Sequence, residues 1–373
     1  MLLTSMLEST PAPPRPIRVM VVDDSVVVRG LIGRWVGAAS GFEVVATAPN
    51  GRIALDLVRE TAPDIVLLDL DMPELDGVSA LPLMLAERPG LSVVVVSTLT
   101  QRNAEISLHC LALGAIDYLP KPGALRELTL SASFREELLV KLDGIAARHR
   151  RGAPVADLSP PGGHLSGPLA TRPRALVIGA SAGGPRAIGE VLKGLGRVSQ
   201  RVPILVVQHM PPIFTTVFAE QLSDETGLDA HEGREGERIE PGHVYVAPGA
   251  HHMGLRLVAG SPSIHLDEGS PIRHCRPALD ILLRDAAAIY DGGALAVVLT
   301  GMGSDGLEGA RTLVRTGGAV IVQDEASSVV WGMPGSIAKA GLARSVLPLG
   351  DIAAAIEDAV THDAASFPLR APA

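Results

Sequence analysis

Short apolar runs alternate along the chain with amphipathic stretches of helical periodicity. The runs are rich in Val, Ile and Leu and end in turn residues, which is typical of buried strands in a parallel sheet. The pattern fills two blocks, from about Ile17 to Pro122 and from Ala175 to about Thr361. It predicts strands at 17–22, 43–46, 65–68, 92–96 and 115–119, and at 175–178, 204–207, 243–247, 294–299 and 319–322.

This rhythm predicts an α/β protein with two domains. Five strands with four intervening helices favour a doubly wound, five-stranded parallel sheet in the first block. The second block predicts another doubly wound, mostly parallel, Rossmann-like sheet. A segment rich in Pro, Gly and Ser separates them. The expected divisions are a disordered extension (1–16), the first domain (17–135), a linker helix and flexible linker (136–174), the second domain (175–361) and a tail (362–373).

Composition narrows the class of protein. The chain of 373 residues is 47% hydrophobic and 20% charged, as globular proteins are, and its formal charge of −9 argues against nucleic-acid binding. Two separated cysteines favour a reducing compartment over a disulfide framework. No apolar run reaches the roughly 20 residues of a membrane span, and the first residues do not resemble a signal peptide. We therefore expect a cytoplasmic protein without membrane insertion.

Charged and hydroxyl side chains stand where the strands of the first block end. Asp23 and Asp24 close the first strand, Asp69 the third and Ser97 the fourth, and Lys121 follows the fifth. The carboxyl ends of parallel strands share one edge, where such folds bind ligands. Three converging carboxylates need a hard cation such as Mg²⁺, and the lysine suits phosphoryl transfer. Acids at strand ends are often only solvated, but five residues in register favour a site.

The first block resembles a response-regulator receiver domain over essentially its whole length. By this resemblance Asp69 is the phospho-acceptor. Mg²⁺ is then held by Asp23, Asp24 and Asp69, with the backbone carbonyl of Asp71 as a further ligand. The residues that contact or respond to the phosphoryl group are the amine of Lys121, the hydroxyl of Ser97 and the aromatic side chain of Tyr118.

A serine stands in a glycine-rich turn after the first strand of the second block. Ser181 lies within Gly179-Ala180-Ser181-Ala182-Gly183-Gly184, between a predicted strand and a helix. Such a turn exposes the hydroxyl beside backbone N–H groups that can stabilise an oxyanion. The alternative is a dinucleotide-binding loop, but the middle glycine of that fingerprint is replaced by Ser181 and no acid ends the next strand. The turn favours a nucleophile.

A histidine and an aspartate follow two other strands of this block. His209 ends the second strand, and Asp305 lies in Thr300-Gly301-Met302-Gly303-Ser304-Asp305-Gly306. We therefore expect Ser181 to attack an acyl carbon, His209 to take its proton and Asp305 to orient the imidazole. Cys275 is an alternative nucleophile, but no activating turn marks it, and we predict that it is unreactive.

The second block resembles the catalytic domain of the chemotaxis protein-glutamate methylesterase along nearly its full length. By this resemblance Ser181, His209 and Asp305 form the triad, and Met302 lies at the oxyanion-hole position. Many relatives carry threonine where this chain has Ala182, so only the backbone N–H of that position remains. The matching motifs include Gln208-His209-Met210, Val244-Tyr245-Val246-Ala247-Pro248-Gly249, Arg276-Pro277-Ala278-Leu279-Asp280 and Gly332-Met333-Pro334.

The two resemblances together imply a phosphorylation-regulated serine hydrolase. It would demethylate glutamyl methyl esters on methyl-accepting chemotaxis receptors, release methanol and, as some members do, deamidate receptor glutamines. A chemotaxis histidine kinase would be the phosphodonor, and phosphorylation of Asp69 would activate the esterase. Mg²⁺ is expected in the receiver domain, and no cofactor is expected for the ester chemistry.

Other interpretations stay open at this point. The hydrolase domain could only bind partners, which would make the chain a signalling adaptor, or it could act on small esters or amides. Arg273 and Arg276 either hold an acidic receptor helix or are solvated surface charges. His251 and His252 lack the spacing of a metal site, so a histidine hydrogen-bonded near the triad is favoured over metal catalysis in this domain.

Overall fold

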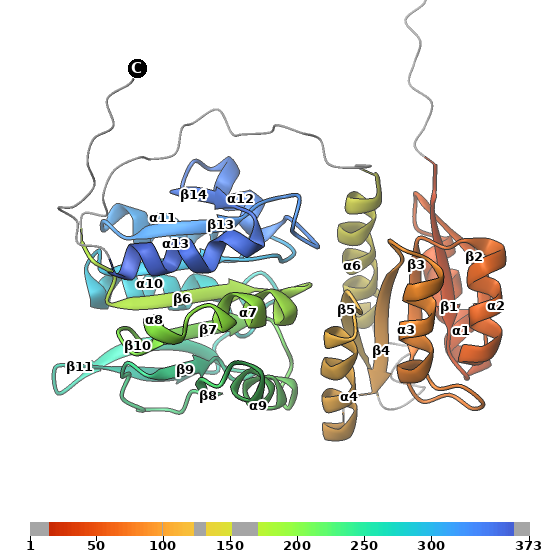
Figure 1. Ribbon diagram of the computed structural model, residues 1–373, viewed down its shortest axis with the longest axis horizontal. Helices are drawn as coiled ribbons and strands as arrows, with labels where there is room; N and C mark the ends of the chain where they lie inside the picture. The colour runs from red at the N-terminus through yellow and green to blue at the C-terminus, as the bar shows by residue number, and fades with distance from the viewer. Residues whose placement is uncertain (1–14, 99, 123–131, 151–170, 362–373) are drawn as a thin grey trace, which may run out of the picture. The chain divides into compact units, whose positions relative to one another are not determined.

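The computed structural model describes residues 15–98, 100–122, 132–150 and 171–361 (Figure 1). Most of the predicted N-terminal extension, residues 151–170 of the predicted linker and the predicted tail lie outside these ranges. The described residues form two sheets with their helices, and each sheet is described by itself.

The first sheet is five-stranded and parallel, with the strand order β2-β1-β3-β4-β5. This is the flavodoxin-like order of doubly wound folds, and it confirms the predicted class. Its strands are β1 (Ile17–Val22), β2 (Phe42–Ala48), β3 (Ile65–Asp69), β4 (Ser92–Thr98) and β5 (Asp117–Lys121). Its helices are α1 (Val26–Gly37), α2 (Gly51–Thr61), α3 (Gly77–Glu87), α4 (Gln101–Ala112) and, after β5, α6 (Ala132–Arg150).

The four helices between these strands begin at side chains that cap them. In each case an oxygen of the capping side chain accepts a hydrogen bond from a backbone N–H of the first turn, which no residue within the helix can satisfy. The caps are Ser25 for α1, Asn50 for α2, Asp76 for α3 and Thr100 for α4. Local sequence therefore sets the point at which each strand-to-helix loop ends.

The second sheet has seven strands in the order β14-β13-β12-β6-β7-β9-β8, and all its pairs are parallel. The chain adds strands on one side of β6 first, with β7, β9 and β8, and then on its other side, with β12, β13 and β14. The strands are β6 (Ala175–Ala180), β7 (Ile204–Gln208), β8 (Asp229–Glu232), β9 (His243–Val246), β12 (Ala294–Val298), β13 (Ala319–Gln323) and β14 (Ser345–Leu347). The helices are α7 (Gly184–Lys193), α8 (Gly196–Ser199), α9 (Phe214–Thr226), α10 (Leu279–Tyr290), α11 (Leu307–Arg315), α12 (Met333–Lys339) and α13 (Leu349–Thr361).

An antiparallel hairpin of β10 (His252–Val258) and β11 (Ser261–Asp267) packs beside this sheet. The hairpin contributes Met253, Leu255 and Ile264 to one buried cluster with strands of the sheet and α10. This core consists mainly of aliphatic side chains, as the low aromatic content requires.

Several predicted elements differ from the structure. The strand predicted at 115–119 is β5, which begins two residues later because the backbone N–H of Ala115 still donates to the carbonyl of Cys110 and closes the end of α4. The strands β8, β10, β11 and β14 were not predicted. They carry charged or polar residues and are short or lie at an edge, so they lack the apolar runs of the central strands.

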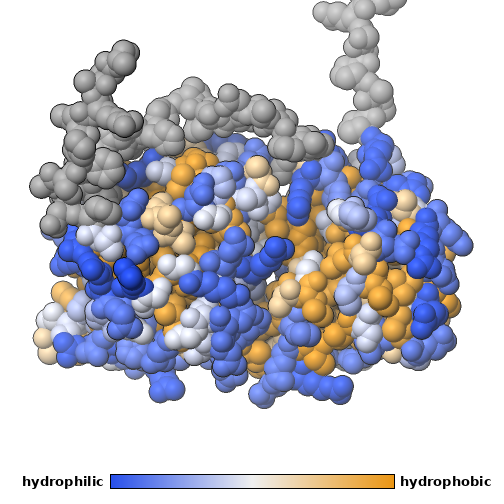
Figure 2. Space-filling view, viewed as in Figure 1, coloured by the Kyte–Doolittle hydropathy of each residue, from blue (hydrophilic) through white to orange (hydrophobic). Residues whose placement is uncertain are grey.

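The distribution of hydrophobic side chains on the surface and in the helices bears on whether the chain can span a membrane. Hydrophilic and hydrophobic side chains are mixed over the face shown in Figure 2. Among the helices of the described ranges, none combines the length and the apolar character that a bilayer crossing requires.

Gly77, the first residue of α3, permits a close approach of this helix to β3. A Cβ atom at Gly77 would overlap the backbone carbonyl of Asp69 and lie 2.9 Å from the Cα of Leu70. We expect Gly77→Ala to lower the free energy of unfolding by about 1–3 kcal/mol, since backbone atoms would have to move. The matched control is Gly30→Ala in α1, where a Cβ meets no atom within 4 Å. This control should raise stability by about 0.5–1 kcal/mol, and equal effects in urea unfolding would contradict the steric argument.

Candidate active site

Ser181 follows β6 in a turn that the backbone holds tightly. The N–H of Ser181 donates to the carbonyl of Thr300 at 3.0 Å, and the N–H of Gly184 donates to the carbonyl of Ser181 at 2.8 Å. Gly183 caps α7 with a φ of 73°, in the left-handed region that favours glycine. The side chain of Ser181 therefore lies at the carboxyl edge of the sheet, and the residue is only 9% exposed.

The register between β6 and β7 brings His209 next to this turn. Ala180 pairs with Gln208, so Ser181 and His209 are the next residues on neighbouring parallel strands. The N–H of His209 donates to the carbonyl of Ala180 at 3.2 Å, and the side-chain amide of Gln208 donates to the carbonyl of Ser181 at 2.9 Å. The predicted neighbourhood of serine and histidine thus follows from strand pairing.

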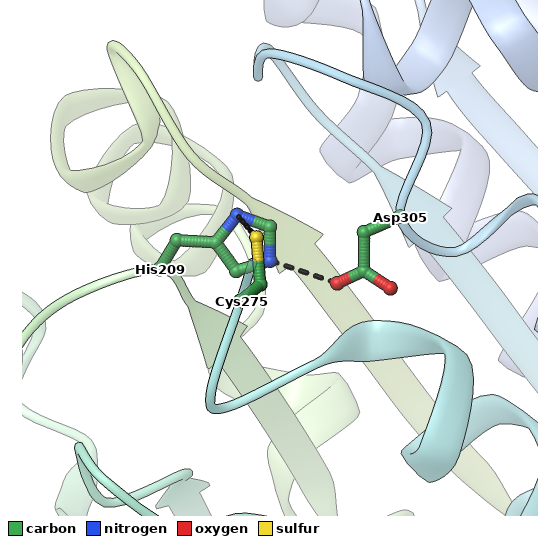
Figure 3. A group of neighbouring side chains, drawn as sticks. All are labelled: His209, Cys275 and Asp305. Carbon is green, nitrogen blue, oxygen red and sulfur yellow. Dashed lines mark hydrogen bonds and ion pairs between the residues drawn. The ribbon is translucent and has the colours of Figure 1, made fainter. Parts of the chain in front are cut away.

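The imidazole of His209 lies between a carboxylate and a thiol (Figure 3). Its Nε2 is 2.8 Å from Oδ2 of Asp305, and its Nδ1 is 3.5 Å from Sγ of Cys275. Asp305 fixes one ring nitrogen, so Nδ1 is the nitrogen that can exchange a proton with a nucleophile.

Asp305 is a buried carboxylate held by backbone N–H groups. The N–H groups of Leu279 and Asp280, at the start of α10, donate to it at 2.6 and 3.0 Å, and that of Gly306 donates at 2.9 Å. Burial alone would raise the pKa of Asp305, but the hydrogen bond and charge of His209 and the N–H groups of Leu279 and Asp280 lower it. The start of α10 also favours negative charge. Asp305 is therefore ionised and fixed in orientation.

The same contacts change the protonation of His209. Burial of the imidazole would lower its pKa, but the hydrogen bond to Asp305 and the contact with Cys275 raise the pKa to about 10. At neutral pH the resting imidazole is therefore protonated, with the Asp305 carboxylate beside it. A base at this position works only after that proton has left.

Cys275 reaches His209 through a tight turn that the sequence did not reveal. Ile272 and Cys275 exchange two backbone hydrogen bonds, of 3.0 and 2.8 Å. Between them Arg273 and His274 have φ values of 50° and 67°, the left-handed pair of a two-residue hairpin turn. Neither residue is glycine, so no turn signal marked this loop. The structure thus adds Cys275 to the group formed by His209 and Asp305.

The loop after β12 lies close to Ser181. A Cβ at Gly301 would be 2.5 Å from Sδ of Met333 and 3.0 Å from both the Cβ and the backbone nitrogen of Ser181, so a side chain here would force its neighbours to shift. Oγ1 of Thr300 donates to the carbonyl of Ala182 at 2.9 Å. Ala182 is buried and Met302 is half-buried. The two predicted oxyanion-hole residues therefore lie on two loops that hydrogen bonds join.

The arginines and histidines noted in the sequence have partners within the same domain. Arg273 donates to Oγ of Ser304 at 2.8 Å, and Arg276 donates to backbone carbonyls of the segment 268–269. Nε2 of His251 is 3.2 Å from the Glu268 carboxylate. Nε2 of His252 is 3.2 Å from the carbonyl of Ser270. These contacts hold the loop that carries Cys275, and none of them joins His251 or His252 to the triad residues.

The first sheet brings together the three predicted acids. Ligand oxygens of Asp23, Asp24 and Asp69 all lie within 4.8 Å of one another, and Asp23 and Asp69 are 2% and 3% exposed. The Oδ1 atoms of Asp23 and Asp69 accept backbone hydrogen bonds at 2.9 Å, from Ser25 and Leu70. Carboxylates at this spacing, of which Asp24 is exposed and the other two are buried, repel one another unless a cation neutralises them, so the group fits Mg²⁺.

The other predicted receiver residues lie on or beside the last strands of this sheet. In the β4–β5 pair Thr98 lies opposite Lys121, and Tyr118 lies within β5. The buried hydroxyl of Ser97 shares a hydrogen bond of 2.7 Å with Oγ of Ser107 in α4. Asp71 is exposed in the turn after β3.

Comparison with known proteins gives both parts of the chain a family. Residues 176–356 match the CheB methylesterase family, and residues 19–133 match the response regulator receiver domain. The protein-glutamate methylesterase/protein-glutamine glutaminase of Nitrobacter hamburgensis is 48% identical over 352 residues, which cover 91% of this chain and 92% of the relative. A group 2 operon protein of the same name from Rhodopseudomonas palustris is 47% identical over 361 residues, with 90% and 92% covered.

Among solved structures, the CheB methylesterase catalytic domain of Thermotoga maritima is 41% identical. The structural match covers 50% of this chain and 98% of the Thermotoga chain, with a TM-score of 0.48. The two relatives above are nearly 50% identical to this chain over about nine-tenths of both chains, and this similarity establishes the family. The chain belongs to the family of protein-glutamate methylesterases that carry a response regulator receiver domain ahead of the methylesterase domain.

Proposed function

We propose that this protein hydrolyses glutamyl methyl esters on methyl-accepting chemotaxis receptors to glutamate and methanol, and deamidates receptor glutamines. The observation that carries the proposal is the 2.8 Å contact between His209 and Asp305 beside the Ser181 turn. Relatives of nearly the same length are named protein-glutamate methylesterase/protein-glutamine glutaminase, which supports this choice of substrate.

Ser181, His209 and Asp305 would act as a nucleophile, a base and an orienting carboxylate. Oγ of Ser181 attacks the ester carbonyl while its proton passes to His209, and the tetrahedral intermediate collapses as that proton is returned to the leaving methanol. Water then attacks the acyl-enzyme with the same base and releases glutamate. With a glutamine the leaving group is ammonia, and the same acyl-enzyme forms.

The nitrogen that receives the proton would be Nδ1 of His209, because Nε2 is engaged by Asp305. Sγ of Cys275 lies 3.5 Å from Nδ1, so the thiol competes with Ser181 for this nitrogen. Cys275 thereby sets how readily the base becomes available.

The oxyanion of the tetrahedral intermediate needs hydrogen-bond donors that are already in position. We assign this role to backbone N–H groups of Ala182 and Met302. The hydrogen bond from Thr300 to Ala182 and the close approach of Gly301 to Ser181 support it, since they fix both loops around the nucleophile.

In the receiver domain Asp69 would accept the phosphoryl group and thereby activate the esterase. Asp23, Asp24, Asp69 and the carbonyl of Asp71 would hold Mg²⁺, which neutralises charge on the transferred oxygens when bound. The clustering of three acids at the ends of β1 and β3 supports this assignment. The residues proposed to contact or respond to the phosphoryl group are Lys121, Ser97 and Tyr118.

The phosphodonor we propose is a chemotaxis histidine kinase, and the compartment is the cytoplasm. The proposed domains are the receiver at 17–135, the linker at 136–174 and the methylesterase at 175–361. The family matches at 19–133 and 176–356 support these divisions.

Ser181→Ala should reduce methanol release from methylated receptor by at least about 10³-fold, because the variant lacks the proposed nucleophile of the acyl transfer. Receptor binding and the unfolding midpoint should stay close to wild type. Ser261→Ala, at the first residue of β11, is the matched control and should retain full activity. Equal methanol release by wild type and Ser181→Ala would show that Ser181 is not the nucleophile. No release by wild type under any condition would favour a signalling adaptor.

Cys275→Ala should move the acidic limb of the pH–rate profile to lower pH. The base is available only above the pKa of His209, which Asp305 and Cys275 raise to about 10. Removing the thiol lowers the pKa of His209. At any pH below that pKa, each unit by which it falls increases the fraction of neutral His209 about tenfold. Cys110→Ala, at the buried cysteine of α4, should leave the limb in place. If the acidic limb of Cys275→Ala lies at the same pH as in wild type, or at a higher pH, this role of the thiol is refuted.

Asp69→Asn should abolish the stimulation of methanol release by acetyl phosphate and Mg²⁺. In wild type this stimulation should be about 5- to 150-fold, the range of typical coupling free energies. Asp56→Asn, at an exposed acid of α2, is the matched control and should keep the stimulation. Stimulation that survives in Asp69→Asn would place the phosphoryl group on another residue, without affecting the assignment of Ser181.

A further inference from the structure

Two histidines and an aspartate meet at the edge of the second sheet that lies away from the catalytic residues. Asp229 and His231 are in the edge strand β8, and His243 is the first residue of the neighbouring strand β9. Asp229 pairs with His243, and His231 is two residues further along β8. Side chains two residues apart on a strand share a face, as do paired residues, so all three point to the same side.

Nitrogen and oxygen atoms of these side chains converge. Nδ1 of His243 is 2.9 Å from Oδ2 of Asp229, and Nδ1 of His231 is 3.6 Å from Oδ1 of the same carboxylate. One ligand atom from each residue lies within 4.8 Å of the other two. Ligand atoms around tetrahedral Zn²⁺ are about 3.3 Å apart when each bond is about 2.0–2.1 Å long. The spacing is close to that of a three-ligand metal site.

The closest of these contacts is not a hydrogen bond. Nδ1 of His243 is buried, and it has no hydrogen-bond partner of adequate geometry within the described ranges, although the Asp229 oxygen is 2.9 Å away. A buried polar atom without a partner is costly and calls for an explanation. Nδ1 of His265 also lacks a partner beside a carboxylate, so this feature alone does not define a site. What distinguishes His243 is that a second imidazole, that of His231, lies beside the same exposed Asp229 carboxylate, so that one cation could bind all three side chains.

A second carboxylate prepares His231 to bind through Nδ1. Nε2 of His231 is 2.8 Å from Oε1 of Glu237, so the proton of a neutral ring belongs on Nε2, and Nδ1, which is 3.6 Å from Oδ1 of Asp229, keeps a free lone pair. A metal-binding histidine usually donates its other N–H to such a carboxylate. The buried ring of Tyr245 packs beside both imidazoles, with ring centroids 5.2 Å from His231 in a T-shaped contact and 5.8 Å from His243 in a tilted one.

We propose that Asp229, His231 and His243 form a binding site for a divalent transition-metal ion, for which Zn²⁺ is the best match. Two imidazole nitrogens and one carboxylate oxygen are ligands that Zn²⁺ accepts, and water completes the fourth position. The site lies where β8 and β9 begin, whereas Ser181 and His209 follow the ends of β6 and β7. The ion therefore ties the edge strand to its neighbour and takes no part in the ester chemistry.

The experiment must separate this site from two other groups that could bind metals in the part of the chain described here, His209–Cys275–Asp305 and Asp23–Asp24–Asp69. We would titrate Co²⁺ into the full chain carrying Cys275→Ser, which removes the only thiolate ligand of these groups, in excess Mg²⁺ to fill the receiver site. One Co²⁺ per chain should bind with visible d–d bands of a nitrogen–oxygen ligand set, and Zn²⁺ should displace it.

Substitutions in the same background test the ligands one by one. His231→Ala and His243→Ala should each weaken Co²⁺ binding by more than about 100-fold, and Glu237→Gln by about 10- to 100-fold, the usual effect of losing a supporting carboxylate. The matched control is His265→Ala, at a histidine whose Nδ1 is 3.3 Å from Glu235 and which has no second imidazole partner in the metal group. Its affinity should be that of the parent chain.

A second readout is thermal unfolding, because an ion that binds only the folded state raises Tm as its concentration increases. Zn²⁺ should raise Tm in the Cys275→Ser chain and not in the same chain with His243→Ala. The proposal is overturned if no Co²⁺ binds in a one-to-one ratio, if binding survives His243→Ala, or if His265→Ala weakens it equally.

Discussion

A negative charge buried in the second sheet is the constraint on which the active site depends. The side chain of Asp305 is 1% exposed, and an ionised carboxylate in such surroundings is tolerated only where hydrogen bonds and a cation compensate it. The compensation comes from the start of α10, from the N–H of Gly306 and from His209. Because α10 must begin at this point, the loop that carries Cys275 is also fixed beside the imidazole.

Both domains place their polar groups at the same kind of topological position. In the first sheet Asp23 and Asp24 follow β1 and Asp69 ends β3, and these two strands are neighbours where the strand order reverses. In the second sheet Ser181 follows β6 and Asp305 follows β12, again the neighbouring pair at the reversal. Loops diverge from such a pair to opposite faces of the sheet and leave room between them. One rule of chain topology thus accounts for the position of both proposed sites, the acidic group of the first sheet and the Ser181 group of the second.

The sequence predicted what depends on local pattern. Apolar runs identified the central strands, and the turns after them carried Ser181, His209 and the three acids to the edges of the sheets. It could not predict the contact between Cys275 and His209, because this depends on a turn formed by two non-glycine residues with positive φ. The cluster of Asp229, His231 and His243 was also missed, since β8 has no apolar run and acquires its partner only in the folded sheet. The roles assigned to the individual site residues stay predictions.

The bond between His209 and Asp305 joins residues 96 positions apart in the chain. Contacts of this range form late, because the entropy of closing a long loop is lost before the contact is gained. A chain emerging from the ribosome can pair β6 with β7 long before β12 has been synthesised, and at that stage Ser181 and His209 are neighbours without an orienting carboxylate. With the roles proposed above, hydrolytic competence would arrive only when β12 and the loop that carries Asp305 have joined β6 and β7, so a shorter nascent chain would carry a Ser181 hydroxyl that is not yet activated.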